Sequence, residues 1–161
     1  MNHRVQVFGL DGTFVRQWGD EGEGPGQFSN PRGVAVVGGE VVVSDGLNYR
    51  VQVFGWDGTL VRQWGGEGDG PGQFKYPWGV AVKGNEVIVT DSLNHRVQVF
   101  GLDGIFVRQW DGEGDGPGRR RQLLDPCCVA VVGARVRCLL ALQDTTACAR
   151  CSNENIVPSE A

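Results

Sequence analysis

One short pattern of apolar and polar positions occurs three times in this chain. It reads RVQVF at residues 4–8, 50–54 and 96–100. In each copy an arginine and a glutamine alternate with two valines, which is the period of a β-strand with one apolar face. The phenylalanine that ends each copy lies on the polar side of this alternation. We therefore expect a strand whose two faces are both covered by other parts of the protein.

The residues around the second copy divide into four strands. Gly38-Gly39 separates the first two strands, as expected for a tight hairpin turn with positive φ angles, and Asp57-Gly58 separates the last two. No segment shows apolar residues at helical spacing, and 26 glycines in 161 residues would weaken any helix. The expected strands, joined as an antiparallel meander, are residues 33–37, 40–45, 49–54 and 59–64.

The whole unit repeats every 46 residues. This spacing is kept by two series of residues, Asn2, Asn48 and Asn94, and Trp18, Trp64 and Trp110. Four antiparallel strands at this period are typical of a propeller blade, whereas a β-sandwich would repeat at about twice the length. The sequence predicts an all-β protein, a partial β-propeller of four-stranded antiparallel blades. The 161 residues hold about 3.5 units, and a closed propeller needs roughly 4–8 blades, so we expect an open arc rather than a closed ring.

The repeats also predict the domain boundaries. Repeat sequence extends over residues 1–118, and residues 119–133 form the degenerate start of a further blade. Residues 134–161 form a divergent tail, which is disordered or reflects a frame change or a truncated gene model. Within the repeats we expect a half blade at 2–18 and full blades at 33–64 and 79–110.

The repeats resemble the NHL repeat family. The resemblance rests on Pro-x-Gly-Val-Ala-Val, Asp-x-x-Asn-x-Arg and Val-Gln-Val-Phe, which follow in this order in residues 31–54 and 77–100. It implies a β-propeller, usually of six blades, that acts as a binding platform for proteins and in some members for RNA. Such domains often accompany ubiquitin-ligase modules, and a few relatives are zinc-dependent lyases. The chain departs from the family in having fewer blades.

The candidate binding surface is the end of the blades that carries the longer loops. In an up-and-down blade, this end holds the loop between the second and third strands and the connection between blades. Arg32 and Trp78 fill the same position of successive repeats with unrelated chemistry, so we expect that the fold does not dictate the position. Both are common interface anchors. Tyr49 and Tyr76 are weaker candidates at the same end.

A second set of residues at this end is expected to be structural. Asp and Asn side chains in turns bond to nearby main-chain groups, so these residues hold their own turns together. The set comprises Asp45, Asn48, Arg50, Asp91, Asn94 and Arg96.

The charge of the chain narrows the choice of partner. The net charge is −4, and residues 1–118 hold 9 basic and 15 acidic side chains. This excess disfavours RNA bound through bulk charge, so a protein is the preferred partner. No apolar run reaches the roughly 18 residues of a membrane helix, and no secretory signal pattern is found. We expect no membrane partner and an intracellular location, with the compartment otherwise open.

The residue pattern indicates neither catalysis nor a bound metal or cofactor. His3 and His95 stand where another copy has tyrosine, and no Ser or Cys lies in a nucleophile motif. Residues 111–116, DGEGDG, begin like a calcium loop but lack its final bidentate glutamate. The pair Cys148-x-x-Cys151 is half of a zinc motif. We expect no enzyme and no cofactor, and we interpret the acidic, Gly-rich connections as flexible and solvated.

An open arc also predicts self-association. Residues 4–18 supply third and fourth strands and residues 122–133 supply a first strand, so two chains would complete each other in a six-bladed ring. We expect the isolated polypeptide to be such a homodimer or an aggregation-prone open arc.

Overall fold

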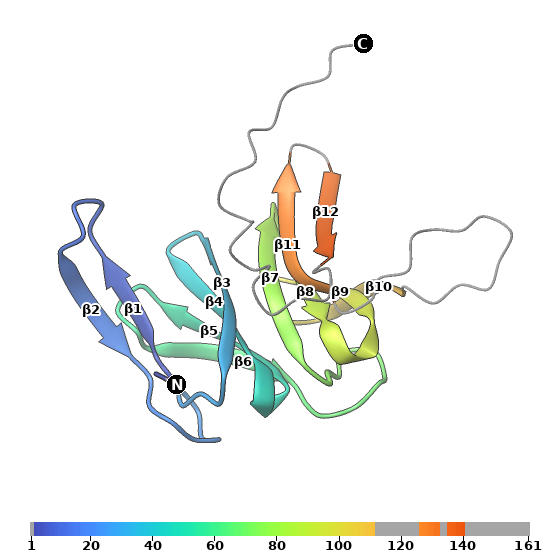
Figure 1. The fold of residues 1–161 in the computed structure, drawn as a ribbon, viewed down its shortest axis with the longest axis horizontal. Coiled ribbons are helices and arrows are strands. Elements are labelled where there is room, and N and C mark those ends of the chain that lie inside the picture. The colour runs from blue at the N-terminus through green and yellow to red at the C-terminus, as the bar shows by residue number, and fades with distance from the viewer. Residues whose placement is uncertain (1, 112–125, 133–134, 141–161) are drawn as a thin grey trace, which may run out of the picture.

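The computed structural model describes residues 2–111, 126–132 and 135–140, which form twelve strands and two short 3₁₀ turns (Figure 1). None of these residues lies in an α-helix, and no helix among them is long and apolar enough to cross a membrane. The elements are β1 (Val5–Phe8), β2 (Phe14–Trp18), β3 (Pro31–Val37), β4 (Glu40–Asp45), η1 (Gly46–Asn48), β5 (Arg50–Gly55), β6 (Leu60–Gly65), β7 (Pro77–Lys83), β8 (Glu86–Asp91), η2 (Ser92–Asn94), β9 (Arg96–Gly101), β10 (Phe106–Asp111), β11 (Pro126–Val132) and β12 (Arg135–Leu140).

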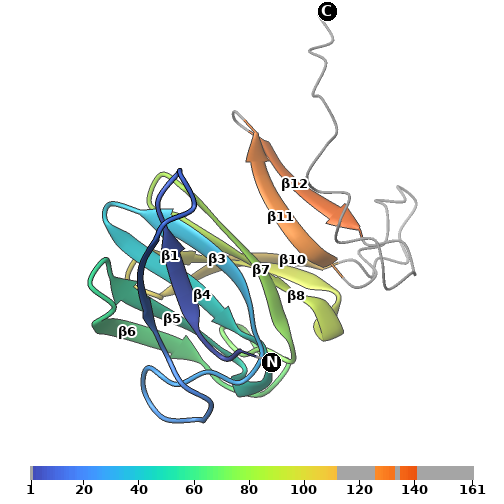
Figure 2. The ribbon, with the colours of Figure 1, turned by 60° about the vertical axis from the view of Figure 1, so that its left-hand side comes forward.

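The strands form four antiparallel sheets that follow one another along the chain. The orders β3-β4-β5-β6 and β7-β8-β9-β10 make two four-stranded blades, and β1-β2 and β11-β12 make two hairpins. The first strands β3, β7 and β11 lie next to one another, as Figures 1 and 2 show. The sheets do not close into a ring. The protein is therefore a partial, open β-propeller of four-stranded blades, as the repeat predicts.

The strand boundaries of the first complete blade lie within two residues of those expected from the sequence. Val37 pairs with Glu40 across the tight turn, in which Gly38 and Gly39 have φ angles of 55° and 83°. Side chains rarely tolerate such angles, which explains the glycine pair. At the other end of the chain, β12 extends to Leu140, beyond the point at which we expect the repeat pattern to end. Residues 112–125 and 141–161, which include most of the tail, lie outside the described residues.

Neighbouring blades approach closely along their first strands. A Cβ atom on Gly33 would lie only 2.5 Å from the carbonyl oxygen of Trp78 and 2.8 Å from the nitrogen of Val80. The hydroxyl of Ser44 accepts a hydrogen bond from the Gly33 nitrogen at 2.8 Å and donates one to the Trp78 carbonyl. Only glycine fits at this point of β3, so the variable residue before it is held at a fixed place between two blades.

Both faces of the third strand are buried. Phe54 is 1% exposed, and its ring centroid lies 5.8 Å from that of Trp18 and 5.5 Å from that of Phe28. Trp18 belongs to the preceding sheet and Phe28 to the connection between the sheets. The same packing recurs around Phe100, at 5.7 and 5.6 Å. Burial of each phenylalanine contributes about 1.5–3 kcal/mol, and the expectation that both strand faces are covered is confirmed.

Candidate functional site

One buried arginine attaches each inter-blade connection to the blade that follows it. Arg50, at the start of β5, is 9% exposed. Its guanidinium donates to the main-chain carbonyls of Glu23, Gly24 and Gln27 at 2.8, 2.8 and 2.9 Å. Arg96 donates to the equivalent three carbonyls one repeat later. These bonds place the inter-blade connection beside the turn between β4 and β5, at one end of the blade.

Asp45 is the centre of this hydrogen-bond network. Its fully buried carboxylate accepts from the Ser29 nitrogen at 2.7 Å, Asn48 Nδ2 at 2.8 Å and Arg50 Nε at 2.9 Å. The same contacts within the following turn join Asp91, Asn94 and Arg96. Asn48 Nδ2 also reaches the Gly22 carbonyl at 2.9 Å. The six residues assigned a structural role thus lie together in two groups of three, and each group extends from its own turn into the preceding connection.

The sequence analysis missed a buried glutamine in the same network. Both faces of its strand are expected to be covered, but nothing in the sequence assigns a hydrogen-bonding role to Gln52, which is 0% exposed. Its side chain accepts from the Gly26 nitrogen at 2.9 Å and donates to the Gln27 carbonyl at 2.8 Å. Gln98 makes the equivalent bonds. The available signal was the GPGQF segment, which stands at the same distance before each of the two glutamines.

Main-chain hydrogen bonds hold the two inter-blade connections that lie within the described residues, a feature that the interpretation from composition did not include. In the first connection the Phe28 nitrogen donates to the Asp20 carbonyl at 2.8 Å, and the Gly22 nitrogen donates to the Phe28 carbonyl at 3.1 Å. The second connection repeats both bonds. A backbone held at both ends in this way fixes the points at which its side chains leave the main chain. The exposed carboxylates of the two connections are Asp20, Glu21, Glu23, Glu67 and Asp69.

Three of the four predicted binding residues form one cluster between neighbouring blades. The guanidinium carbon of Arg32, on β3, lies 4.5 Å from the ring centroid of Trp78, on β7. Arg32 Nε and Nη2 donate to the hydroxyl of Tyr76 at 3.1 and 2.8 Å. The rings of Tyr76 and Trp78 meet edge to face at 5.6 Å. The unlike residues in this repeat position therefore contact each other across the blade junction, which comparison of the two copies does not reveal.

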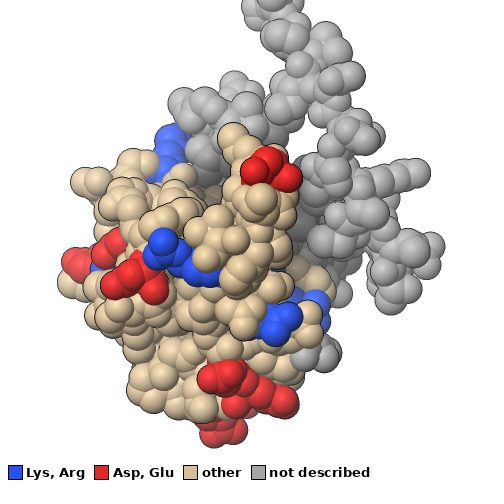
Figure 3. All heavy atoms as spheres, turned by 90° about the vertical axis from the view of Figure 1, so that its left-hand side faces the viewer, with Lys and Arg blue, Asp and Glu red and all other residues tan. Residues whose placement is uncertain are grey.

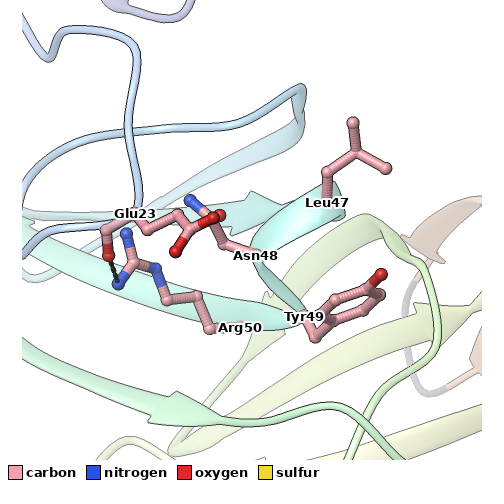
Figure 4. A pocket seen from close by; sticks show the side chains of 5 residues that line it. All are labelled: Glu23, Leu47, Asn48, Tyr49 and Arg50. Carbon is pink, nitrogen blue, oxygen red and sulfur yellow. Dashed lines mark hydrogen bonds between the residues drawn. The ribbon is translucent and has the colours of Figure 1, made fainter.

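Tyr49, the fourth predicted binding residue, lines a separate hollow at the same end of the blade. The hollow measures about 220 Å³ and is lined by Glu23, Leu47, Asn48, Tyr49 and Arg50 (Figure 4). Tyr49 has a φ of 54° and packs partly against the main hydrophobic core. Sequence reasoning places the connection and the turn at the same end of the blade, but it did not select Glu23 or Leu47, because the linear pattern does not show which residues of the two segments meet.

The residues of this network lie in the segments that match a known family. The family model of the NHL repeat matches residues 28–54 and 74–100. Each match begins at a buried phenylalanine of the connection, passes through the Asp–Asn–Arg turn and ends at the phenylalanine buried between blades. Residues 28–54 and 74–100 are NHL repeats.

Two known proteins resemble parts of this chain. The RING finger protein nhl-1 of Caenorhabditis elegans is 52% identical over 44 residues, which are 27% of this chain and 4% of that protein. The crystal structure of an exported protein of Bacteroides fragilis has the same fold, with a TM-score of 0.54 and 18% identity over 80% of this chain and 32% of that one. The chain therefore spans only a small part of either protein.

The described part of the chain holds no group of three His, Cys, Asp or Glu side chains that could bind a metal ion. His3 is part of the packing of a connection, with Nδ1 3.2 Å from the Phe28 carbonyl oxygen and Nε2 3.9 Å from a carboxylate oxygen of Glu21. The calcium-like segment at 112–116 and the pair Cys148 and Cys151 lie outside the described residues.

Proposed function

We propose that this NHL chain is a non-catalytic binding module that holds a protein partner at the loop end of its blades. The observation that carries the proposal is the Arg32–Tyr76–Trp78 cluster at the blade junction, where Arg32 is exposed and both rings are partly exposed. Tryptophan, tyrosine and arginine are the residue types most enriched among interface anchors. NHL repeats generally mediate protein interactions, and their propeller fold is typically non-catalytic.

Trp78→Ala is expected to weaken the affinity for a protein partner by about 1–2 kcal/mol, as the loss of an interface anchor does. The loss of the contact between Arg32 and Trp78 within the chain is a smaller effect, because an exposed cation–π contact contributes about 0.5–1 kcal/mol. The matched control is Trp56→Ala, which removes a 47% exposed tryptophan from the turn at the opposite end of β5. Proteins retained from a cell extract by each immobilised variant are quantified by mass spectrometry, and the affinities of those retained are then measured by titration. Retention of the same proteins with equal affinity by parent and Trp78→Ala would contradict the proposal.

An RNA-binding platform is the second candidate. A cation stacked on an aromatic ring, as Arg32 is on Trp78, is a feature of single-strand binding surfaces. The exposed carboxylates of the same end oppose this candidate. Capture that depends on Trp78 and disappears after ribonuclease treatment would favour RNA over protein. A place within a larger ubiquitin-ligase-type protein is a further proposal, supported by the name of the RING finger relative.

We also propose that the 161-residue polypeptide associates with itself. Val34 and Val36 on β3 are 60% and 58% exposed, whereas Val80, on β7 beside β3, is 7% exposed. In addition, β1 pairs only with β2 among the described strands. Apolar faces and open strand edges promote association. A homodimer in which β11-β12 adjoins β1-β2 of a second copy would cover the apolar face of β3 and the open edge of β1. Light scattering at micromolar concentration should give the mass of a dimer or of larger aggregates, and a stable monomer would contradict this proposal.

A further inference from the structure

The hollow beside Tyr49 supports a more specific inference, which rests on the proposed protein-binding function. Its volume of about 220 Å³ lies below the roughly 300–1,000 Å³ of pockets for drug-sized ligands. A space of this size, open at the surface, suits a single side chain of a partner rather than a free small molecule. The chemistry of its walls indicates which kind of side chain.

The walls of the hollow combine apolar surface with one free negative charge. Leu47 is 48% exposed, and the Tyr49 ring adds an aromatic wall. The Glu23 carboxylate is exposed and has no hydrogen bond or ion pair within the described part of the chain. Arg50 does not neutralise it, because its guanidinium is directed to Asp45 and to main-chain carbonyls, including that of Glu23 itself (Figure 4). Within the described residues no cation forms an ion pair with the Glu23 carboxylate, although the Arg50 guanidinium lies in the same wall.

The surroundings of the hollow favour a positively charged partner. The five exposed carboxylates of the two connections outnumber the nearby exposed cations, which are Arg32 on β3 and Lys75 in the second connection. Figure 3 shows acidic side chains gathered at the lower end of the molecule, where the connection between β2 and β3 lies in Figure 1. Such a field attracts cationic segments.

The hollow and the aromatic cluster also adjoin each other. A Cβ atom on Gly46, the first residue of η1, would lie 3.3 Å from the Tyr76 ring and 3.5 Å from Arg32 Cγ. The next residue, Leu47, lines the hollow. One partner segment that contacts the cluster therefore reaches the hollow across a single turn.

We propose that this hollow binds a lysine side chain from a basic, unstructured segment of the protein partner. The apolar stem of a lysine packs along Leu47 and the Tyr49 ring, and its ammonium group meets the Glu23 carboxylate. Lysine combines an apolar stem with a charged head in this way, and aromatic faces attract ammonium groups.

The test uses a labelled synthetic peptide in which lysines alternate with serines, and the same peptide with every lysine acetylated. Acetylation keeps the stem and removes the charge. Binding is measured by fluorescence anisotropy at about 0.15 M salt, where distant charges are screened. We expect the parent chain to bind the lysine peptide at least about threefold more tightly than the acetylated one, the range of an exposed charge pair.

Two variants and one matched control locate the site. Glu23→Gln and Tyr49→His should each weaken binding of the lysine peptide at least about twofold. Histidine is compatible with the backbone at this position, because His3 and His95 have φ angles of 34° and 50° in the equivalent places. Asp69→Asn, which changes the carboxylate equivalent to Glu23 in the next repeat, should have a smaller effect than Glu23→Gln.

Equal binding of the two peptides would overturn the inference. Equal losses in Glu23→Gln and Asp69→Asn would also overturn it, because they would indicate attraction by bulk charge. If the peptide test fails while Trp78→Ala still releases captured proteins, the inference falls and the proposed binding function stands.

Discussion

Replacing Asp45 with asparagine is expected to lower the free energy of unfolding by about 3–5 kcal/mol. Removing one partner of a buried ion pair leaves the other charge, here the Arg50 guanidinium, without compensation. Asparagine keeps the shape of the side chain but turns one acceptor into a donor, whereas Asp45 accepts from Ser29, Asn48 and Arg50. Urea denaturation followed by tryptophan fluorescence measures the loss.

Glu40→Gln is the matched control, because it also converts a carboxylate opposite an arginine into an amide. Arg62 donates to Glu40 at 2.8 and 2.6 Å, but the two side chains are 25% and 30% exposed, so we expect a loss below about 1 kcal/mol. The hydrogen bond from Arg62 lowers the pKa of Glu40 below its ordinary value of 4.5. The stability that the Glu40–Arg62 pair contributes is therefore fully present above pH 4.5, and it is lost as the pH falls through the lowered pKa of Glu40. Similar losses in the two variants at neutral pH would contradict our account of the Asp45 network.

Phe100→Ala is expected to cost about 3–5 kcal/mol in unfolding free energy, as a large cavity does. Phe100 is 0% exposed and is surrounded by Trp64, Phe74 and Phe106. Phe8 holds the same position in the first copy but is 53% exposed, so Phe8→Ala should cost less than about 1 kcal/mol. The two variants are compared by the same urea titration. If they lose equal stability, coverage by the neighbouring blade is not what stabilises this position.

The strands could be predicted from the sequence because their signals are local. Alternation along residues 50–54 and the glycine pair at 38–39 act within a few residues of the structure they specify. The 46-residue period then indicates stacked blades and so explains why Phe54, on the polar side of its strand, is buried. These inferences need no knowledge of which distant segments touch.

The candidate site could be predicted only in part, because its contacts join segments 20 to 46 residues apart. Sequence reasoning selected Arg32 and Trp78 from their unlike chemistry, but not the stacking of one on the other. It assigned no role to Gln52, since the connection whose main chain bonds to its side chain comes 25 residues earlier. It also treated Glu23 as one of many charges in a glycine-rich link, although Arg50 fixes the main chain of that residue beside Tyr49.

The central claim is that these repeats bind a protein at their loop end. Its most direct test is hydrogen–deuterium exchange, measured on the chain alone and on the chain bound to a protein that was captured through Trp78. The account predicts slower exchange on binding in residues 20–32, 46–50 and 66–78. It predicts no change in the turns at the opposite end, residues 55–59 and 101–105. Slower exchange confined to those turns would contradict the claim.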